Sequence, residues 1–307
     1  MNLEGAAQQR PQHTQFMLNK YNENPAYGGL DRSLSVYAMY RDQYTALNGS
    51  PKNMSAGGHI PFYLWNGALG FQIFNQSAGV MNHSGLNISY NYVLGTDFGL
   101  LSVGGRVGGE FISINGSGIL TPDGIYDDGF DHNDPILDES TFSGIGLSYQ
   151  AGVYFYSEEI EAGVSLGELP GFSANVDPAV YSKSAFANLF FEYKYRLDAT
   201  KSLSAGLLLK ADRAVIQTDL YALYKIRGGV FGGLSLRGYN RGSLDAVNII
   251  IGSKINDHFS LSYSHDIGIS GLRNVNDGSH EILLTYNLNK LIGIGLSPKV
   301  IYNPRYL

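Results

Sequence analysis

The sequence predicts an all-β transmembrane barrel, and three observations carry that prediction: a two-residue alternation, a low charge content and the absence of a long apolar run. In residues 259–265 (FSLSYSH), Phe259, Leu261 and Tyr263 fall on one face of a strand and serines occupy the other. Residues 187–197 alternate in the same way. This pattern, repeated over a chain of 307 residues, is typical of antiparallel strands whose apolar face meets lipid.

Composition supports the barrel and argues against other classes. Charged residues make up 16% of the chain, against about 25% in a typical soluble protein. The 22 tyrosines suit the membrane interface, where a ring sits in lipid and its hydroxyl in water. No stretch approaches the roughly 20 apolar residues of a transmembrane helix. A net charge of −6 argues against nucleic acid as a partner, and the absence of cysteine excludes disulfides and thiolate chemistry.

The alternating segments number about fourteen, an even count as single-chain bacterial barrels require. They span residues 31–41, 51–60, 65–75, 83–94, 98–114, 144–156, 160–168, 183–197, 202–211, 213–226, 228–239, 243–253, 257–267 and 278–289. Every second connection is tight, at 94–98, 156–160, 197–201, 225–229 and 254–258. The two longest connections, 115–143 and 167–182, fall between these turns.

Bacterial barrels have short turns on the periplasmic side and long loops outside, so this alternation places both chain termini in the periplasm. We therefore predict a periplasmic N-terminal extension at 1–30, a barrel at 31–289 and a C-terminal segment folded on the periplasmic side at 290–307. Asn24 and Asn303 precede prolines and should be extended or turn-like. Because residues 1–7 contain no apolar signal-peptide region, we interpret the numbering as that of the mature protein, with residues 1–5 as an added or misassigned start.

Charged residues on the strands predict a polar barrel interior. Arg106 and Glu110 share the polar face of 98–114, and Glu192, Lys194 and Arg196 share that of their strand. Charges inside a barrel must be paired or hydrated, so we expect a salt-bridged interior. A lumen that holds a polypeptide segment is the sharper alternative.

The connection 115–143 carries seven carboxylates, Asp123, Asp127, Asp128, Asp131, Asp134, Asp138 and Glu139. Such oxygens can bind calcium, but their spacing does not match an EF-hand, and a solvated recognition loop is the preferred interpretation. The seven histidines show no metal-binding spacing, and no G-x-S-x-G elbow precedes a helical pattern. We therefore predict no metal, no cofactor and no enzymatic activity.

Several short motifs, in order along the chain, resemble the PorP/SprF family of outer-membrane proteins of the type IX secretion and gliding machinery. The opening residues 8–12 (QQRPQ), 14–16 (TQF) and 24–29 (NPAYGG) resemble the start of that family. Further similar stretches are 40–44 (YRDQY), 49–51, 59–61, 154–157 (YFYS), 161–165, 263–266 (YSHD), 271–273, 278–283 and 302–305 (YNPR).

The resemblance implies a non-enzymatic protein of the outer membrane that exports or attaches secreted cargo, often adhesins, by recognising a C-terminal domain. It also implies a possible periplasmic partner, a peptidoglycan-binding lipoprotein. On that basis the candidates for cargo binding are Asp123, Asp127, Asp128, Asp131, Asp134 and Phe172. The candidates for the periplasmic partner are Phe16, Asn24, Pro25, Tyr27, Asn303, Pro304 and Arg305. The alternatives are a diffusion channel or small-hydrophobe transporter, and, less favoured, an outer-membrane hydrolase.

Overall fold

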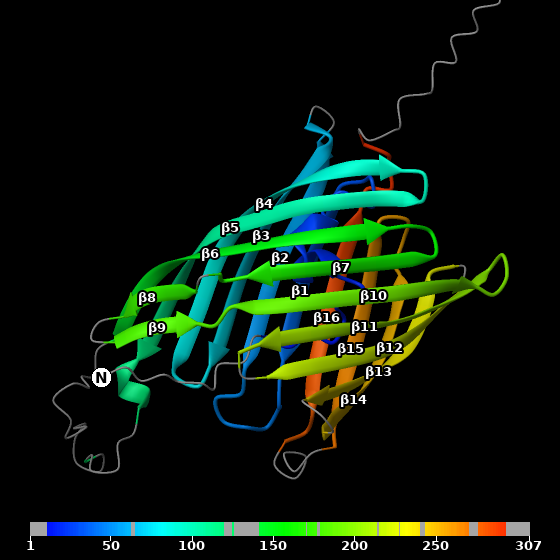
Figure 1. Cartoon of the computed structure of the whole chain (residues 1–307). Coiled ribbons are helices and arrows are strands. Elements are labelled where there is room, and N and C mark those ends of the chain that lie inside the picture. Colours follow the sequence, from blue (N-terminus) through cyan, green and yellow to red (C-terminus); the bar gives the residue numbers. More distant parts are fainter. Residues whose placement is uncertain are drawn as a thin grey trace, which may run out of the picture.

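The computed structural model of the chain describes residues 11–62, 65–119, 125, 141–169, 171–176, 179–213, 215–226, 228–239, 243–269 and 276–292. Fourteen antiparallel strands form a closed barrel, and a separate two-stranded hairpin accompanies it (Figure 1). Each barrel strand pairs with its sequence neighbours, except that β7 pairs with β10 across the hairpin and β1 closes the barrel against β16. The predicted fold class and strand number are confirmed.

The strands begin and end within a few residues of the predicted limits. The barrel strands are β1 (Ser35–Asp42), β2 (Lys52–Phe62), β3 (Gly67–Ala78), β4 (Met81–Thr96), β5 (Gly99–Asn115), β6 (Thr141–Tyr156), β7 (Ile160–Gly167), β10 (Phe186–Arg196), β11 (Lys201–Asp212), β12 (Ile216–Ile226), β13 (Val230–Tyr239), β14 (Ser243–Lys254), β15 (Phe259–Gly268) and β16 (Ser279–Asn287). The hairpin strands β8 (Phe172–Val176) and β9 (Ala179–Lys183) lie within the predicted loop 167–182 and the residue after it.

The alternation of residue types separates an apolar outer wall from a polar inner wall. On β10, Leu189, Phe191 and Tyr193 are exposed on the outside, whereas Asn188 and Glu192 are buried inside. Successive side chains of a strand point to opposite faces, so one polar residue in two is enough to line the interior. The outer wall therefore presents an almost continuous apolar surface to the bilayer.

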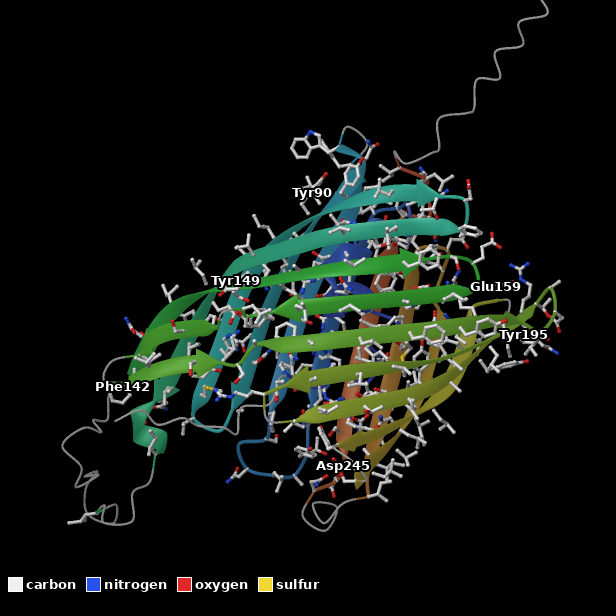
Figure 2. The ribbon with its side chains drawn as sticks, in the orientation of Figure 1. Tyr90, Phe142, Tyr149, Glu159, Tyr195 and Asp245 are labelled. Atoms are coloured by element: carbon white, nitrogen blue, oxygen red, sulfur yellow. The ribbon has the colours of Figure 1, made fainter. Side chains whose placement is uncertain are left out.

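The two ends of the barrel differ in their connections. One end, the short-turn end, carries the turns after β2, β4, β6, β10, β12 and β14, together with the start of β1 and the end of β16. Its turns are stabilised locally: the Asp198 carboxylate accepts a hydrogen bond from the Thr200 N–H (2.6 Å), and the Asn256 side chain accepts one from the His258 N–H (2.9 Å). Glu159 and Tyr195 lie at this end (Figure 2). The opposite end, the long-loop end, carries the connections 116–140 and 168–185.

Residues 11–34, here called the plug segment, lie inside the barrel. We had expected an extension outside the barrel mouth, so this placement differs from the expectation. The segment contains a short helix α1 (Lys20–Glu23) and a 3-10 turn η1 (Pro25–Tyr27). Asn24 is extended (φ −144°, ψ 116°), as its position before proline predicts. Among the described helices, none is both long and apolar enough to cross a membrane.

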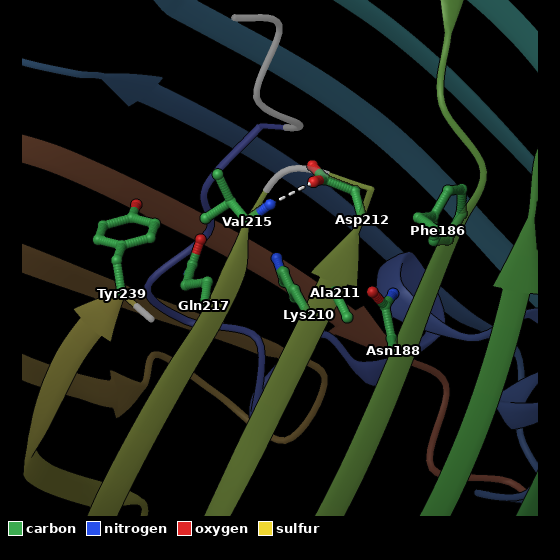
Figure 3. Close-up of a pocket in the computed structure, with 8 residues that line it drawn as sticks. All are labelled: Phe186, Asn188, Lys210, Ala211, Asp212, Val215, Gln217 and Tyr239. Atoms are coloured by element: carbon green, nitrogen blue, oxygen red, sulfur yellow. Dashed lines mark hydrogen bonds between the residues drawn. The ribbon is translucent and has the colours of Figure 1, made fainter. Parts of the chain in front are cut away.

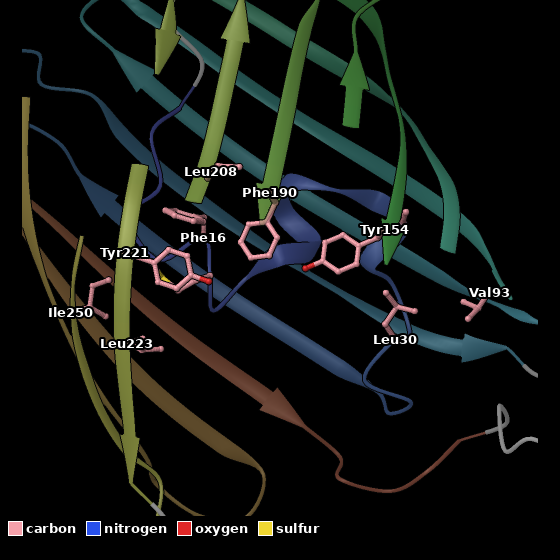
Figure 4. Packing of buried hydrophobic residues seen from close by; sticks show 11 residues of the cluster. Phe16, Leu30, Val93, Tyr154, Phe190, Leu208, Tyr221, Leu223 and Ile250 are labelled. Atoms are coloured by element: carbon pink, nitrogen blue, oxygen red, sulfur yellow. The ribbon is translucent and has the colours of Figure 1, made fainter. Parts of the chain in front are cut away.

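Aromatic packing fixes the plug segment against the inner wall (Figure 4). Phe16 meets the rings of Tyr221 and Phe190 edge to face, with centroids 5.4 Å and 6.3 Å away. Tyr27 packs edge to face on Tyr154 at 5.2 Å. Rings in this geometry add to the free energy gained from burial alone. Phe190, an aromatic residue between Asn188 and Glu192 on the inner face of its strand, thus has its partner in the plug.

The β8–β9 hairpin folds onto the inner wall of β5 and β6 near the long-loop end. Phe172 packs with Ile112 of β5 in a small apolar cluster. Gly146 makes room for it, because a Cβ at Gly146 would lie 2.4 Å from the Phe172 ring. A Cβ at Gly144 would lie 2.2 Å from the Asn175 carbonyl oxygen. The glycines of β6 therefore allow close approach of a second layer of backbone.

Candidate functional site: the filled lumen

Five charged residues from five strands form a buried cluster in the lumen, the arginine cluster: Arg41, Asp219, Arg237, Asp266 and Glu281. Arg41 on β1 stands opposite Glu281 on β16, and Asp219 on β12 stands opposite Arg237 on β13, so strand register alone brings each pair together. Asp266 on β15 joins the two pairs, accepting from Arg41 Nη2 (2.6 Å) and Arg237 Nη1 (3.0 Å). All five side chains are buried, so each charge depends on its partners for compensation.

The plug segment is anchored on this cluster through Thr14 and Gln15. The backbone N–H groups of both residues donate to the Glu281 carboxylate at 2.9 Å. The Thr14 hydroxyl donates to Asp266 Oδ1 (2.7 Å) and accepts from Arg41 Nη1 (3.0 Å). Hydrogen bonds to ionised groups are stronger than those between neutral groups. Thr14 and Gln15 are therefore held by charge as well as by packing.

A second buried charge group holds the middle of the plug. Lys20 Nζ lies 2.8 Å from both Glu161 on β7 and Glu192 on β10. Lys194 approaches the other oxygen of Glu161 at 2.6 Å. Burial by itself lowers the pKa of Lys20, but the two carboxylates outweigh burial and raise the pKa above its usual 10.5. Lys20 is therefore a fixed positive charge at physiological pH.

The inner wall also binds the carbonyl oxygens at the end of α1. Arg106 on β5 donates to the backbone carbonyl oxygen of Tyr21 (2.5 Å). Gln150 on β6 donates to the backbone carbonyl oxygen of Glu23 (2.8 Å). The Asn24 side chain continues the contact by donating to the Val153 carbonyl at 3.1 Å. These bonds supply partners for carbonyl groups that the short helix leaves free.

A third charge group ties the hairpin to the wall at the long-loop end. Glu110 on β5 contacts His83 Nε2 (2.7 Å) and the ammonium of Lys183, which ends β9. Lys183 Nζ also lies 3.3 Å from Glu168 and 4.2 Å from the centroid of the Phe172 ring. The hairpin is thereby held by charge on one side and by apolar packing on the other.

Of the five residues predicted to line the lumen, Arg106, Glu110 and Glu192 are buried inside with the partners described above. Lys194 is partly buried and reaches Glu161. Arg196 is exposed at the short-turn end of β10.

The structure changes the interpretation of several candidate partner-binding residues. Phe16, Asn24 and Pro25 are buried in the lumen and Tyr27 is partly buried, so a periplasmic partner has little access to them. Phe172 is 1% exposed beneath β6, which removes it from the outer surface expected for cargo binding. The remaining candidates lie outside the described residues: Asp123, Asp127, Asp128, Asp131, Asp134, Asn303, Pro304 and Arg305.

Sequence reasoning missed the arginine cluster, although a signal for it existed. Arg41, Asp219, Arg237, Asp266 and Glu281 each interrupt a predicted strand with a charge on its polar face. A charge within a membrane strand needs a partner, but the sequence does not give the register of the strands, and so does not say which charges stand opposite one another. Only the register of β1 against β16 pairs Arg41 with Glu281.

Two hollows lie along the barrel wall. A cavity of about 30 Å³ lies near the long-loop end and is lined by Phe186, Asn188, Lys210, Ala211, Asp212, Val215, Gln217 and Tyr239 (Figure 3). A hollow of about 360 Å³ along β3–β6 is lined by Phe74, Ser84, Gly85, Leu86, Gly109, Glu110, Phe111 and Ile145. The described part of the chain contains no group of three or more His, Asp or Glu side chains that could hold a metal ion.

Solved structures with a similar fold are outer-membrane barrels. The toluene transporter TbuX of Ralstonia pickettii superposes with a TM-score of 0.56 at 12% identity, over 87% of this chain and 92% of the transporter. Omp33 of Acinetobacter baumannii gives a TM-score of 0.49 at 9% identity, over 84% of this chain and 99% of that protein. A FadL homologue of Pseudomonas aeruginosa gives 0.49 at 12% identity, over 86% and 92%. At 12% identity the likeness to TbuX shows the fold alone.

The family assignment comes from the sequence as a whole. A comparison with curated proteins finds no match. Residues 5–286 match the family described as Type IX secretion system membrane protein PorP/SprF, which covers the plug segment and all but the last residue of the barrel. The barrel fold and this match place the protein in the outer membrane. The chain therefore belongs to the PorP/SprF family of type IX secretion system membrane proteins.

Proposed function

We propose that the protein is a non-enzymatic docking component of the type IX secretion system that binds secreted cargo at the cell surface, through the cargo's C-terminal domain. The observation that carries the proposal is the filled lumen. Residues 11–34 occupy the barrel and are held by a buried hydrogen bond from Thr14 to Asp266 and by buried ion pairs of Lys20. A barrel whose interior is used by its own chain is suited to presenting a surface and poorly suited to conducting a solute.

The surface that we propose for cargo is the long-loop end. Seven carboxylates lie in the connection between β5 and β6, from Asp123 to Glu139. Carboxylates this close together in the sequence repel one another unless cations or a basic partner neutralise them. A cargo domain with a basic patch would gain affinity from that neutralisation.

The test of this proposal combines native purification with charge removal. Replacing Asp127, Asp128 and Asp131 with Asn should leave the barrel folded, because the substitutions lie outside the strands. Cargo that co-purifies with the unmodified protein should fall in amount, and its salt dependence should flatten, since exposed charges are screened within about 8–10 Å at physiological salt. The matched control replaces Glu158 and Glu159, in the turn after β6, with Gln. Unchanged cargo retention at low and high salt would exclude this connection as the charged contact.

A channel or small-hydrophobe transporter is the second candidate, and one observation favours it: the fold resembles that of TbuX, a toluene transporter. The two candidates differ in conductance. The purified barrel in a planar bilayer should show no steady single-channel current if the plug segment fills the lumen. A reproducible current from the unmodified protein would favour the channel.

We further propose that a periplasmic partner, a peptidoglycan-binding lipoprotein, contacts the short-turn end. With Phe16, Asn24 and Pro25 buried, the candidates that remain are Asn303, Pro304 and Arg305 at the end of the chain. Deleting residues 302–307 should release such a partner in co-purification while the barrel still inserts. A truncated protein that retains the same partner in the same amount would exclude these residues.

A further inference from the structure

Strand β6 extends well beyond its neighbour β7 toward the long-loop end. The last residue pair between the two strands is Gln150–Gly167, followed by one hydrogen bond from the Glu168 N–H to the Tyr149 carbonyl (3.0 Å). On its other side β6 is paired with β5 along its whole length, as far as Thr141. Within the described chain, no strand pairs with residues 141–148 on the side that faces β7.

Among the described residues, this edge has no strand partner because the chain turns inward after β7. Glu168 adopts a left-handed conformation (φ 56°), and β8 then lies against the inner face of β6 instead of continuing along its edge. Phe172 and Asn175 of β8 cover Gly146 and Gly144 from inside. Figure 1 shows β6 continuing past the tip of β7, with β8 and β9 beside it, and Figure 2 places Phe142 and Tyr149 along this half of the strand.

The direction of the free backbone groups follows from the pairing pattern. In an antiparallel ladder the N–H and C=O of one residue point to the same neighbour, and those of the next residue point to the other. Because the Tyr149 carbonyl bonds toward β7, the N–H and C=O groups of Leu147, Ile145 and Ser143 also point to that side. The free edge therefore offers three donors and three acceptors at strand spacing.

Two of the three outward side chains at this edge, Ile145 and Leu147, are apolar, and the third is Ser143. Ile145 is 73% exposed and Leu147 is 69% exposed. They extend the apolar outer wall, since Ile145 pairs with Phe111 of β5 and Leu147 pairs with Gly109, itself paired with Leu86. An unpaired edge beside lipid-facing side chains is costly, because hydrocarbon supplies no hydrogen-bond partners. An exposed apolar edge is also the standard template for adding a strand from another chain.

We propose that residues 143–147 of β6 bind an extended strand of the cargo's C-terminal domain, which adds to the barrel wall above β7. This inference rests on the proposed function and names the site through which the cargo is held. The strand would pair with the free backbone groups, as in other complexes formed by strand addition. Its outward residues should be apolar to continue the Ile145–Leu147 surface, and its inward residues small, because Phe172 and Asn175 occupy the inner side.

The position of the edge also suits a cargo that contacts the acidic connection. Residue 141, where β6 begins, directly follows that connection, so one domain could meet the carboxylates and the strand edge together. The charged contact would steer the encounter, whereas the strand pairing would determine how long the complex lasts.

Photo-crosslinking in the native organism tests the location. p-Benzoylphenylalanine at Leu147 should form a crosslink that mass spectrometry assigns to the C-terminal domain of a secreted protein. The matched control is the same probe at Leu234, which is 56% exposed on the outer face of β13 but has paired strands on both sides. A crosslink to a second copy of this chain, or to residues 120–140 of the same chain, would overturn the proposal.

A pair of substitutions at Ile145 tests the hydrogen bonding. Ile145→Pro removes one N–H that points to the free side and leaves the ladder with β5 intact, whereas Ile145→Ala keeps the N–H and shortens the side chain. We expect Ile145→Pro to reduce the cargo crosslink at Leu147 by about tenfold, with a smaller reduction for Ile145→Ala. Barrel folding is checked separately by the shift between heated and unheated samples on a denaturing gel.

The outcomes separate this proposal from the proposed function. Cargo that co-purifies with the unmodified protein but gives no Leu147 crosslink, or is retained equally by a folded Ile145→Pro variant, overturns the strand edge alone. Absence of any co-purifying cargo overturns the proposed function together with this site.

Discussion

At the scale of the residue, charges buried in compensated groups hold the plug segment in the lumen. Arg41 contacts both Asp266 (2.6 Å) and Glu281 (3.1 Å) with almost no exposed surface. Such a cluster contributes little net stability relative to apolar residues of the same shape, yet removal of one member is costly. The cluster positions the plug segment, because Thr14 and Gln15 donate hydrogen bonds to its carboxylates.

Replacing Arg41 with Ala should destabilise the barrel by about 3–5 kcal/mol. Glu281 would lose Arg41 and keep the two N–H groups of the plug, while Asp266 would keep Arg237. Urea unfolding of the protein refolded in lipid vesicles measures the change. Arg196→Ala, at an exposed position, is the control and should lie within about 0.5 kcal/mol of the parent. Equal stability of the two variants would contradict this role of the cluster.

At the scale of the element, the positions of glycines determine where the β8–β9 hairpin can pack against the inner face of the barrel wall. The β8–β9 hairpin lies on β6 because Gly144 and Gly146 present no side chain on the inner face. Among the described residues, the same inward fold leaves residues 141–148 of β6 without a strand partner on the side that faces β7. The inward fold of the β8–β9 hairpin therefore both narrows the lumen and leaves this edge of β6 unpaired among the described residues.

Gly146→Val should displace the hairpin, since even a Cβ at this position would lie 2.4 Å from the Phe172 ring. Limited proteolysis of the folded barrel should then cut faster within residues 168–185. Gly109→Val is the matched control on the neighbouring strand, because a Cβ at Gly109 meets no atom within 4 Å. The expectation fails if both variants resist the protease as the parent does.

At the scale of the whole molecule, the barrel is a closed wall around its own N-terminal segment. Its two ends differ in the length of their connections. The short-turn end carries the start of β1 and the end of β16. The plug segment enters the lumen at the long-loop end and runs toward the short-turn end, opposite in direction to β1. Gln12 contacts Gln43, just beyond the long-loop end of β1, whereas Gly29 donates to His59, nearer the short turns. The chain therefore descends through the barrel before it begins the wall.

Because the chain has no cysteine, single thiols report the orientation of the barrel. Asp128→Cys, in the connection between β5 and β6, should react with an impermeant maleimide on intact cells. Asp257→Cys, in the turn after β14, should react only after the outer membrane is permeabilised, since short turns face the periplasm. Labelling of Asp257→Cys on intact cells would reverse the orientation.

Strand β10 and the plug segment show which features of the structure could be predicted from the sequence and which could not. The faces of β10 follow from its alternation, because a strand's period is a local property of the chain. The same alternation puts Phe190 inside without explaining why an aromatic residue belongs there. Its partner, Phe16, is 174 residues away in sequence, and nothing local links the two.

The sequence by itself determined the barrel class, the number of strands, the outer and inner faces and the family. These depend on periodicity, turn residues and ordered motifs, which are all read along the chain. Only the tertiary structure decided that residues 11–34 lie in the lumen, that five separated charges form one cluster and that, among the described residues, part of β6 has no strand partner on the β7 side. Each of these depends on strand register around a closed wall and on the space that glycines leave inside it, and such distances are set only when the barrel closes.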